Sequence, residues 1–194
     1  MSTEHVSKWK AKSQVDYISA FMPLWLAFNS WMKTWCQTQL EDERKNFTDR
    51  DCIELLKKTT NAKNQTYTSF KKLITELSIA GDNFKSQFVE LSSALDNMYL
   101  SGKNYEEPVS FSHALVDVEN KVYEDLTKNS KRDAIEFTND IYFTNDVDKL
   151  YKAYLEIIYT VRCELFHGNL LPDEDTERLI KHVFLTFSTI MGEL

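Results

Sequence analysis

The scarcity of chain-breaking residues is the feature that most restricts how this chain can fold. Four Gly and three Pro occur among 194 residues, whereas β-sandwiches and barrels need many tight turns that are rich in both. The composition is 42% hydrophobic and 13% aromatic, which is enough to bury a sizeable core. We therefore expect an all-α protein, built as an antiparallel helical bundle with an additional helical or loop insertion between the first and last helices.

Hydrophobic residues recur at helical spacing near the N-terminus. The stripe consists of Tyr17, Phe21, Leu24, Trp25, Phe28, Met32 and Trp35. Pro23 interrupts this stripe and predicts a kink or a restarted helix. Ser13 with Asp16, and Thr48 with Asp51, have the spacing of helix N-terminal capping residues.

The C-terminal third has a second strong helical pattern. Gly168 follows it and is well placed to end the helix as a left-handed C-cap. Pro172 and the acidic residues 173–175 then begin a last helix, and the short connection predicts that the two helices lie antiparallel. The stripe of the first of these helices consists of Leu150, Tyr154, Ile158, Val161 and Leu165.

The middle of the chain is less regular. We expect one domain over residues 1–194, with core elements at about 13–38 and 147–192 and further helices and loops over 41–145. Within that middle part, apolar spacing predicts a helix from about Phe111 to Leu126. Residues 134–146 are interpreted as a loop or a short hairpin.

Charge and cysteine content exclude several classes of protein. A net charge of −7 gives no global attraction for polyanions, so DNA is not expected as a partner and any nucleic-acid contact must be local. Three cysteines without a CxxC pair indicate neither a disulfide framework nor a zinc site, which fits a reducing cytoplasm. No signal peptide is apparent, and the apolar stretch from Ile18 to Met32 is too short and too polar to span a membrane.

The segment YTVRCELFHGN, residues 159–169, combines cationic, thiol, carboxylate and imidazole groups at a predicted helix end. Arg162 and His167 are five residues apart, which is about 140° around an ideal helix, so they do not share one face. Neither residue is needed for the internal core. A joint role requires either unwinding of the helix at Gly168 or a contribution from a second copy of the chain.

VRCELFHG resembles the Arg, four residues, His signature of the HEPN superfamily, the higher eukaryotes and prokaryotes nucleotide-binding domains. FMPLWLAFNSW resembles the first-helix pattern of several HEPN families, and the final amphipathic helix also agrees. The resemblance covers about residues 17–35 and 150–191. It implies a compact α-helical bundle, frequently a homodimer, in which the Arg and His of both protomers line one cleft.

Many proteins of this superfamily are metal-independent endoribonucleases, including toxins of toxin–antitoxin and phage-defence systems. The resemblance implies that Arg162 holds the scissile phosphate and that His167 acts as general base or acid while the RNA 2′-hydroxyl attacks. Neither a metal nor another cofactor is expected. The expected partners are RNA, a second copy of the chain and an antitoxin or other protein.

Three further residues are candidates for supporting roles. Cys163 occupies a position that is often polar in the ribonuclease members. Because a thiol is a weak hydrogen-bond donor, we expect it to affect the rate of RNA cleavage or the positioning of the RNA. Glu164 either orients His167 or is simply solvated, and Asn29 either reaches the motif helix or is satisfied by backbone groups in the core. Asn169 stands where one toxin group has a Tyr that is nucleotidylated, so that type of regulation is not expected.

Two alternatives stay open at this point. The chain is expected to be either a ribonuclease or a non-catalytic HEPN module that binds a nucleotide or RNA or acts as a protein scaffold. In a purely structural interpretation, Arg162 pairs with a carboxylate or a helix-terminal carbonyl, and His167 caps the helix C-terminus.

Overall fold

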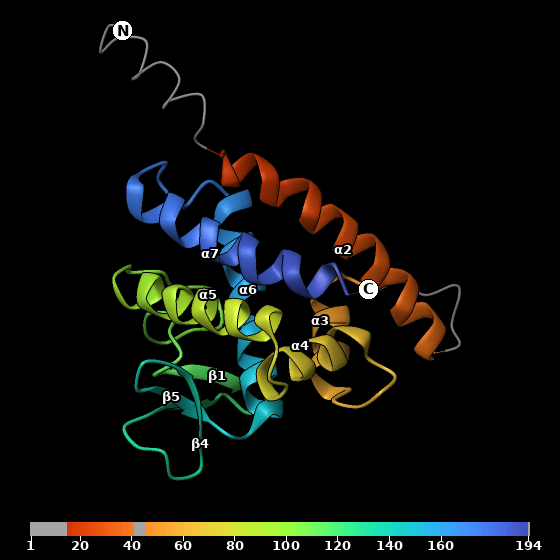
Figure 1. The fold of residues 1–194 in the computed structure, drawn as a ribbon. Helices are drawn as coiled ribbons and strands as arrows, with labels where there is room; N and C mark the ends of the chain where they lie inside the picture. Colours follow the sequence, from red (N-terminus) through yellow and green to blue (C-terminus); the bar gives the residue numbers. More distant parts are fainter. Residues whose placement is uncertain (1–14, 41–45, 194) are drawn as a thin grey trace, which may run out of the picture.

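The computed structural model describes residues 15–40 and 46–193, and these contain six helices and five short strands (Figure 1). The helices precede and follow the strands in the chain. Their bounds are α2 (Tyr17–Leu40), α3 (Asp49–Lys58), α4 (Gln65–Thr75), α5 (Ile79–Asp96), α6 (Val147–Phe166) and α7 (Glu174–Met191). The strands are β1 (Ala114–Asp117), β2 (Val122–Glu124), β3 (Thr127–Lys128), β4 (Ala134–Thr138) and β5 (Ile141–Thr144).

The helices form crossing layers. Figure 1 shows α7 between α2 and α5, with α6 running behind α7 and α5 at a steep inclination. The last helix packs mainly on α5 and α2, and it meets α6 where Tyr154 donates a hydrogen bond to Thr186 at 3.1 Å. The predicted antiparallel pairing of the last two helices is therefore wrong, because the short connection after α6 turns the chain across the bundle.

The core is aromatic and is centred on α6. Tyr151 and Tyr154 of this helix are fully buried. Phe88 of α5 has its ring centroid within 6 Å of rings from the strand region and from α6. Each such side chain contributes roughly 1.5–3 kcal/mol of hydrophobic stabilisation. Helices and strands consequently share one core.

The five strands contradict the all-α prediction, and the fold is mixed α and β. Strands β1 and β2 form an antiparallel pair, and β3, β5 and β4 form a three-stranded antiparallel sheet in that order. Figure 1 shows these strands below α5, at the end of the molecule remote from α2. The insertion over 41–145 thus holds three helices and all five strands, rather than helices and loops alone.

The predicted helix over 111–126 is instead a hairpin, and local turn chemistry explains why. The Asp117 carboxylate accepts a hydrogen bond from the Asn120 backbone N–H at 3.1 Å, and Lys121 has a φ of 52°, so the chain reverses there. Leu115 and Leu126 are still buried, as the apolar spacing required, but from two adjacent extended segments. Apolar spacing alone did not distinguish these arrangements.

Several local predictions are confirmed. Residues 134–146 include the β4–β5 hairpin, in which Asn139 and Asp140 both have positive φ, as a type I′ turn requires. Thr48 and Asp51 form a complete capping box at the start of α3.

Two other local predictions have a different outcome. The helix does not restart at Pro23, because Pro23 lies inside α2, which continues without a break. Ser13 lies outside the described residues.

Candidate functional site

The C-terminal end of α6 sets the position of His167. The Gly168 N–H donates to the Leu165 carbonyl at 3.2 Å and the Asn169 N–H donates to the Glu164 carbonyl at 2.9 Å, with Gly168 at a φ of 71°. This is a Schellman motif, and it confirms the predicted glycine C-cap. His167 is the C-cap residue and is exposed to solvent. No hydrogen bond to its ring is found in the described part of the chain.

Arg162 is held much more firmly than His167. Its Nη2 lies 3.1 Å from Asp49 Oδ2, and its guanidinium carbon lies 5.3 Å from the Trp25 ring centroid and 4.6 Å from that of Phe166. Asp49 also pairs with Lys33 at 3.1 Å. A fifth of the Arg162 side chain is exposed. The residue thus joins α6 to α2 and α3 within a single chain.

A cleft of about 480 Å³ lies against the last two turns of α6. It is lined by side chains of α6, by the loop of residues 102–104 and by Arg50 of α3. The lining residues are Arg50, Gly102, Lys103, Asn104, Tyr159, Thr160, Cys163, Glu164 and His167. Arg162 is not one of them, although its Nη1 lies 3.8 Å from Cys163 Sγ. The structure therefore brings His167, Cys163 and Glu164 into one cleft and leaves Arg162 behind its wall.

The β1–β2 hairpin holds in place the loop of residues 102–104, which lines the cleft. The Tyr123 hydroxyl of β2 donates to the Asn104 carbonyl at 2.7 Å and accepts from the Glu106 N–H at 3.2 Å. Gly102 presses on α6 so closely that an added Cβ would lie 2.5 Å from Thr160 Cγ2. Only a glycine leaves room for this approach. The hairpin, which the apolar spacing predicted as a helix, therefore positions the loop that lines part of the cleft.

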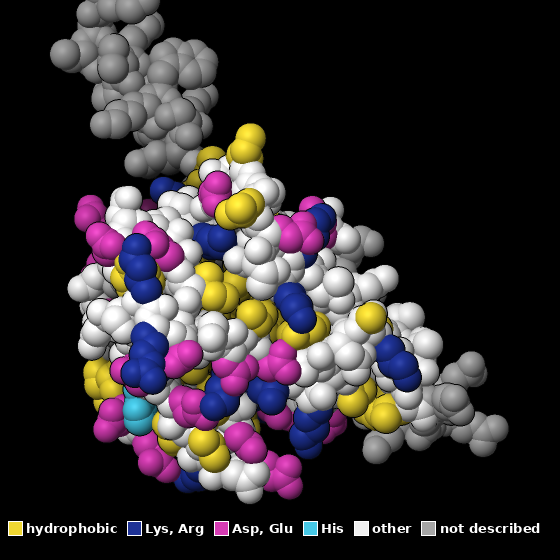
Figure 2. Space-filling view, turned by 60° about the horizontal axis from the view of Figure 1, so that its bottom comes forward, with side chains coloured by type: hydrophobic (Ala, Val, Ile, Leu, Met, Phe, Trp, Pro, Cys, Tyr) yellow, Lys and Arg dark blue, Asp and Glu magenta, His cyan; other side chains and the backbone are white. Residues whose placement is uncertain are grey.

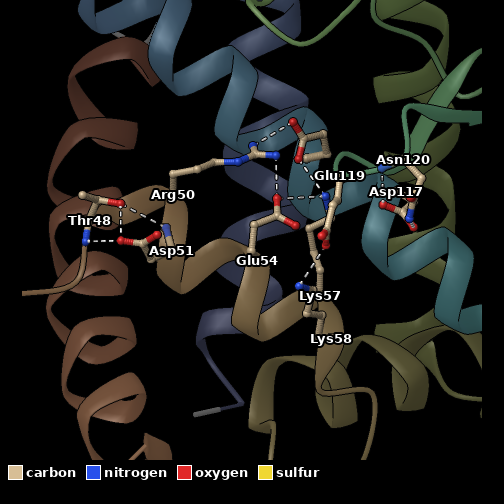
Figure 3. A network of polar contacts seen from close by, with 10 residues as sticks. Thr48, Arg50, Asp51, Glu54, Lys57, Lys58, Asp117, Glu119 and Asn120 are labelled. Atoms are coloured by element: carbon tan, nitrogen blue, oxygen red, sulfur yellow. Dashed lines mark hydrogen bonds and ion pairs between the residues drawn. The ribbon is translucent and has the colours of Figure 1, made fainter. Parts of the chain in front are cut away.

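Arg50 is held in the cleft by a buried ion-pair network. Its Nη1 lies 2.8 Å from Glu156 Oε1, and Lys57 Nζ lies 2.9 Å from Glu156 Oε2. Figure 3 shows Arg50, Glu54 and Lys57 directed toward one another along α3. Burial raises the pKa of Glu156, but attraction by Lys57 and Arg50 outweighs burial, so the pKa is lowered below its ordinary value. Glu156 is therefore a buried carboxylate shared by two cations, and Glu54, which pairs with both, supplies the second negative charge.

Tyr159 and Cys163 occupy adjacent turns of α6 beneath Arg50. The Arg50 guanidinium carbon lies 5.3 Å from the Tyr159 ring centroid. Burial, and then the neighbouring Cys163 thiol, raise the pKa of Tyr159 to about 12. The phenol thus stays protonated at neutral pH and presents a hydrogen-bond donor at the cleft wall.

The remaining predicted residues have different surroundings. The Glu164 carboxylate accepts a hydrogen bond from the Asn169 side-chain amide at 3.0 Å, and no contact between Glu164 and the His167 ring is found within residues 15–40 and 46–193. Asn29 lies on α2 between Trp25 and Lys33, one turn from each. Its Oδ1 and the Nε of Arg162 are both buried without a hydrogen-bond partner in the described chain. Asn29 is thus not satisfied by backbone groups through that oxygen.

Several residues of the site were missed from sequence, among them Asp49, Arg50, Lys103 and Asn104. Asp49 and Arg50 follow the capping residue Thr48 and look like ordinary charges in the first turn of a helix. Lys103 and Asn104 lie in a segment recognisable only as a loop. No signal at their own positions points to the end of α6, which is more than 50 residues away in the chain.

Metal chemistry has no obvious location in the residues that the structure covers. No group of three or more His, Cys, Asp or Glu side chains there is arranged to hold a metal ion.

None of the described helices is both long and apolar enough to cross a membrane. On the face shown in Figure 2, Lys and Arg side chains alternate with Asp and Glu, so this face has no extended basic patch.

Comparison of the chain with protein-family models, with curated proteins and with solved structures gives no match.

Proposed function

We propose that this protein is a metal-independent endoribonuclease of the HEPN type, in which His167 transfers protons and Arg162 stabilises phosphate charge. The observation that carries the proposal is the cleft at the end of α6. There an exposed imidazole without a hydrogen-bond partner in the described chain lines the same cleft as the Lys103 ammonium, which has no carboxylate partner in the described chain either. The net charge of the protein is −7. It therefore needs local positive charge beside the imidazole to bind and cleave a polyanion.

In the proposed reaction the RNA 2′-hydroxyl gives its proton to the His167 imidazole and attacks the adjacent phosphorus. The 2′-oxygen to phosphorus bond forms while the bond from phosphorus to the 5′-oxygen breaks. The leaving 5′-oxygen takes a proton from an acid, for which His167 of a second copy is the candidate. The products are a 2′,3′-cyclic phosphate and a 5′-hydroxyl, so atoms and charge balance without an oxidant or a metal.

Arg162 contributes through a fixed orientation. The Asp49 carboxylate and the Trp25 and Phe166 rings restrict its guanidinium, and little conformational freedom remains to be lost when it meets a phosphate. In one copy of the chain it lies outside the cleft that holds His167. The proposal therefore includes a homodimer, in which the exposed edge of Arg162 meets the RNA together with His167 of the other copy.

The test is cleavage of a labelled oligoribonucleotide in EDTA by the wild-type chain, His167→Ala and Arg162→Ala. We expect wild type to cleave RNA but not the all-deoxy oligonucleotide, because the reaction needs the 2′-hydroxyl. Loss of the proton-transfer group should lower the rate by about 10²- to 10⁴-fold. Lys63→Ala is the matched control, since Lys63 is exposed in the α3–α4 turn and does not line the cleft. Equal rates for wild type and His167→Ala would assign the cleavage to a contaminant.

A second candidate function is RNA binding without cleavage. The observation that favours it is the ion pair of Arg162 with Asp49, which offsets the charge that the ribonuclease scheme needs. Together with the C-cap position of His167, this pair is also what the purely structural interpretation of the motif predicts. RNA binding that persists in EDTA with no cyclic-phosphate product from any variant would favour this second candidate.

A further inference from the structure

The loop of residues 102–104 presents two polar side chains to the cleft that have no partner among the described residues. Lys103 is exposed and Asn104 is half-buried, and both line the same cleft as His167. Neither the Lys103 ammonium nor the Asn104 side-chain amide has a hydrogen bond or ion pair within the described chain. Other lysines near this region are paired, among them Lys57 with Glu156, Lys121 with Glu106 and Lys149 with Glu124.

The backbone that carries these side chains is fixed at several points. The Tyr123 hydroxyl holds the Asn104 carbonyl, the Tyr105 N–H donates to the Gly102 carbonyl at 3.0 Å, and Gly102 rests directly on Thr160. The neighbouring Tyr105 side chain is buried. A backbone fixed by contacts, with side chains that have no partner, is the arrangement expected of a binding site. The conformational entropy of the loop is already lost on folding and does not have to be lost again on binding.

The charges around the cleft indicate what the site binds. The Arg50 charge is offset by Glu156 and Glu54, whereas the Lys103 charge has no such partner. The carboxylate of Glu164 also lines the cleft, and it accepts a hydrogen bond from Asn169. Lys103 is therefore the cation available to an anionic ligand, and the Asn104 amide offers one donor and one acceptor group side by side, as the edge of a nucleobase does.

We propose that the cleft between the end of α6 and residues 102–104 is a nucleotide subsite, in which Lys103 binds an RNA phosphate and Asn104 hydrogen-bonds the adjoining base. This inference rests on the proposed function, since it takes RNA as the ligand, and it adds base preference beside the scissile bond. A cleft of about 480 Å³ lies within the usual range for small-ligand sites, roughly 300–1,000 Å³. Unpaired bases in single-stranded RNA are the ones whose edges are open to such recognition.

Binding is measured separately from cleavage, by fluorescence anisotropy with 2′-deoxy-substituted, uncleavable oligonucleotides of U, C, A and G. Lys103→Ala should weaken binding of all four probes about tenfold and make the salt dependence shallower by about one phosphate contact. Asn104→Ala should leave average affinity nearly unchanged and abolish a discrimination between bases of about tenfold. Lys63→Ala, which removes the same charge in another turn, should do neither.

Gly102→Ala provides a second variant that keeps both side chains. Its Cβ would push the loop away from Thr160, so the base preference should weaken although Asn104 is intact. Thermal melting of each variant identifies any that fail to fold, and the Lys103 and Asn104 variants then decide the question.

The possible results separate this inference from the proposed function. Variants that alter binding while no form of the chain cleaves RNA would retain the subsite and remove the catalytic proposal. Cleavage by wild type, with Lys103→Ala and Asn104→Ala unchanged in affinity, salt dependence and base order, would retain catalysis and overturn the subsite. A wild-type chain that binds none of the four probes would overturn both.

Discussion

Charged groups in the middle of α6 are paired within the described chain, whereas the imidazole at its C-terminal end, the tip, is not. In the middle, the fully buried Glu156 and the partly buried Glu54 both pair with Lys57 and Arg50, so each charge is matched. At the tip, His167 and Lys103, which lines the same cleft, are exposed and have no partner in the described chain. One helix therefore has two roles. Its ion-paired side chains stabilise the fold, and the unpaired side chains at its end are available to a ligand.

The largest effect should come from breaking the buried network. Glu156→Ala leaves the Lys57 and Arg50 cations with Glu54 as their remaining carboxylate partner, and removing one member of a buried ion pair costs about 3–5 kcal/mol. We expect the free energy of unfolding in urea to fall by that amount. A loss below about 1 kcal/mol would mean that water reaches these cations and that the middle of α6 resembles its tip.

The same carboxylate should make stability depend on acid pH. The pKa of Glu156 is below its ordinary value of 4.5, so its contribution is present above about pH 4.5 and is lost as pH falls through the lower, folded-state pKa. Urea unfolding from pH 7 to pH 3 should show a steeper loss for wild type than for Glu156→Gln. Other carboxylates with lowered pKa values, such as Asp117 and Asp173, act equally in both proteins and cancel in the difference. Parallel curves would contradict the prediction.

An intermediate effect is expected at Asp49, between the two regions. Asp49→Ala removes the carboxylate partner of Arg162 and of Lys33, and leaving a largely buried charged group unpaired costs about 1–3 kcal/mol. Thermal unfolding and RNA affinity should both be measured. We expect lower stability with RNA affinity retained or increased, because the Arg162 guanidinium gains freedom to meet a phosphate. Unchanged stability would show that Asp49 does not hold Arg162.

The smallest effect on folding should be found at the tip. His167→Ala and Lys103→Ala remove exposed side chains that make no hydrogen bond in the described chain, so the free energy of unfolding should change by no more than about 0.5 kcal/mol. Urea unfolding of both variants beside Glu156→Ala provides the direct contrast. A loss of 2 kcal/mol or more at either position, on the order of a core substitution, would make the residue structural.

Much of the helical framework was predictable, because its signals are local. The Thr48 and Asp51 capping box and the left-handed Gly168 each involve groups within a few residues of one another, and both are as predicted. The error lay in residues 111–126, where apolar residues at helical spacing belong to a hairpin. That spacing does not distinguish one helix face from two strands that bury the same residues, and the turn at Asp117 to Lys121 decided between them.

The candidate site was predicted only on its α6 side. His167, Cys163 and Glu164 were identified because they adjoin one another in the chain and follow a strong helical pattern. Lys103, Asn104 and Arg50 were not identified, since their relation to that helix exists only after folding. The Arg50 contact with Glu156 spans 106 residues and the Lys57 contact spans 99.

The amino-acid sequence by itself determined where α3 and α7 begin, where α6 ends and which residues stand at that end. Helix hydrogen bonds and caps join groups three to five positions apart, so their chemistry is readable in order along the chain. Only the tertiary structure decided that a hairpin would carry a loop against this helix end and that Asp49 would hold Arg162. Those contacts depend on how separate elements bury a shared core, and no short stretch of sequence contains that information.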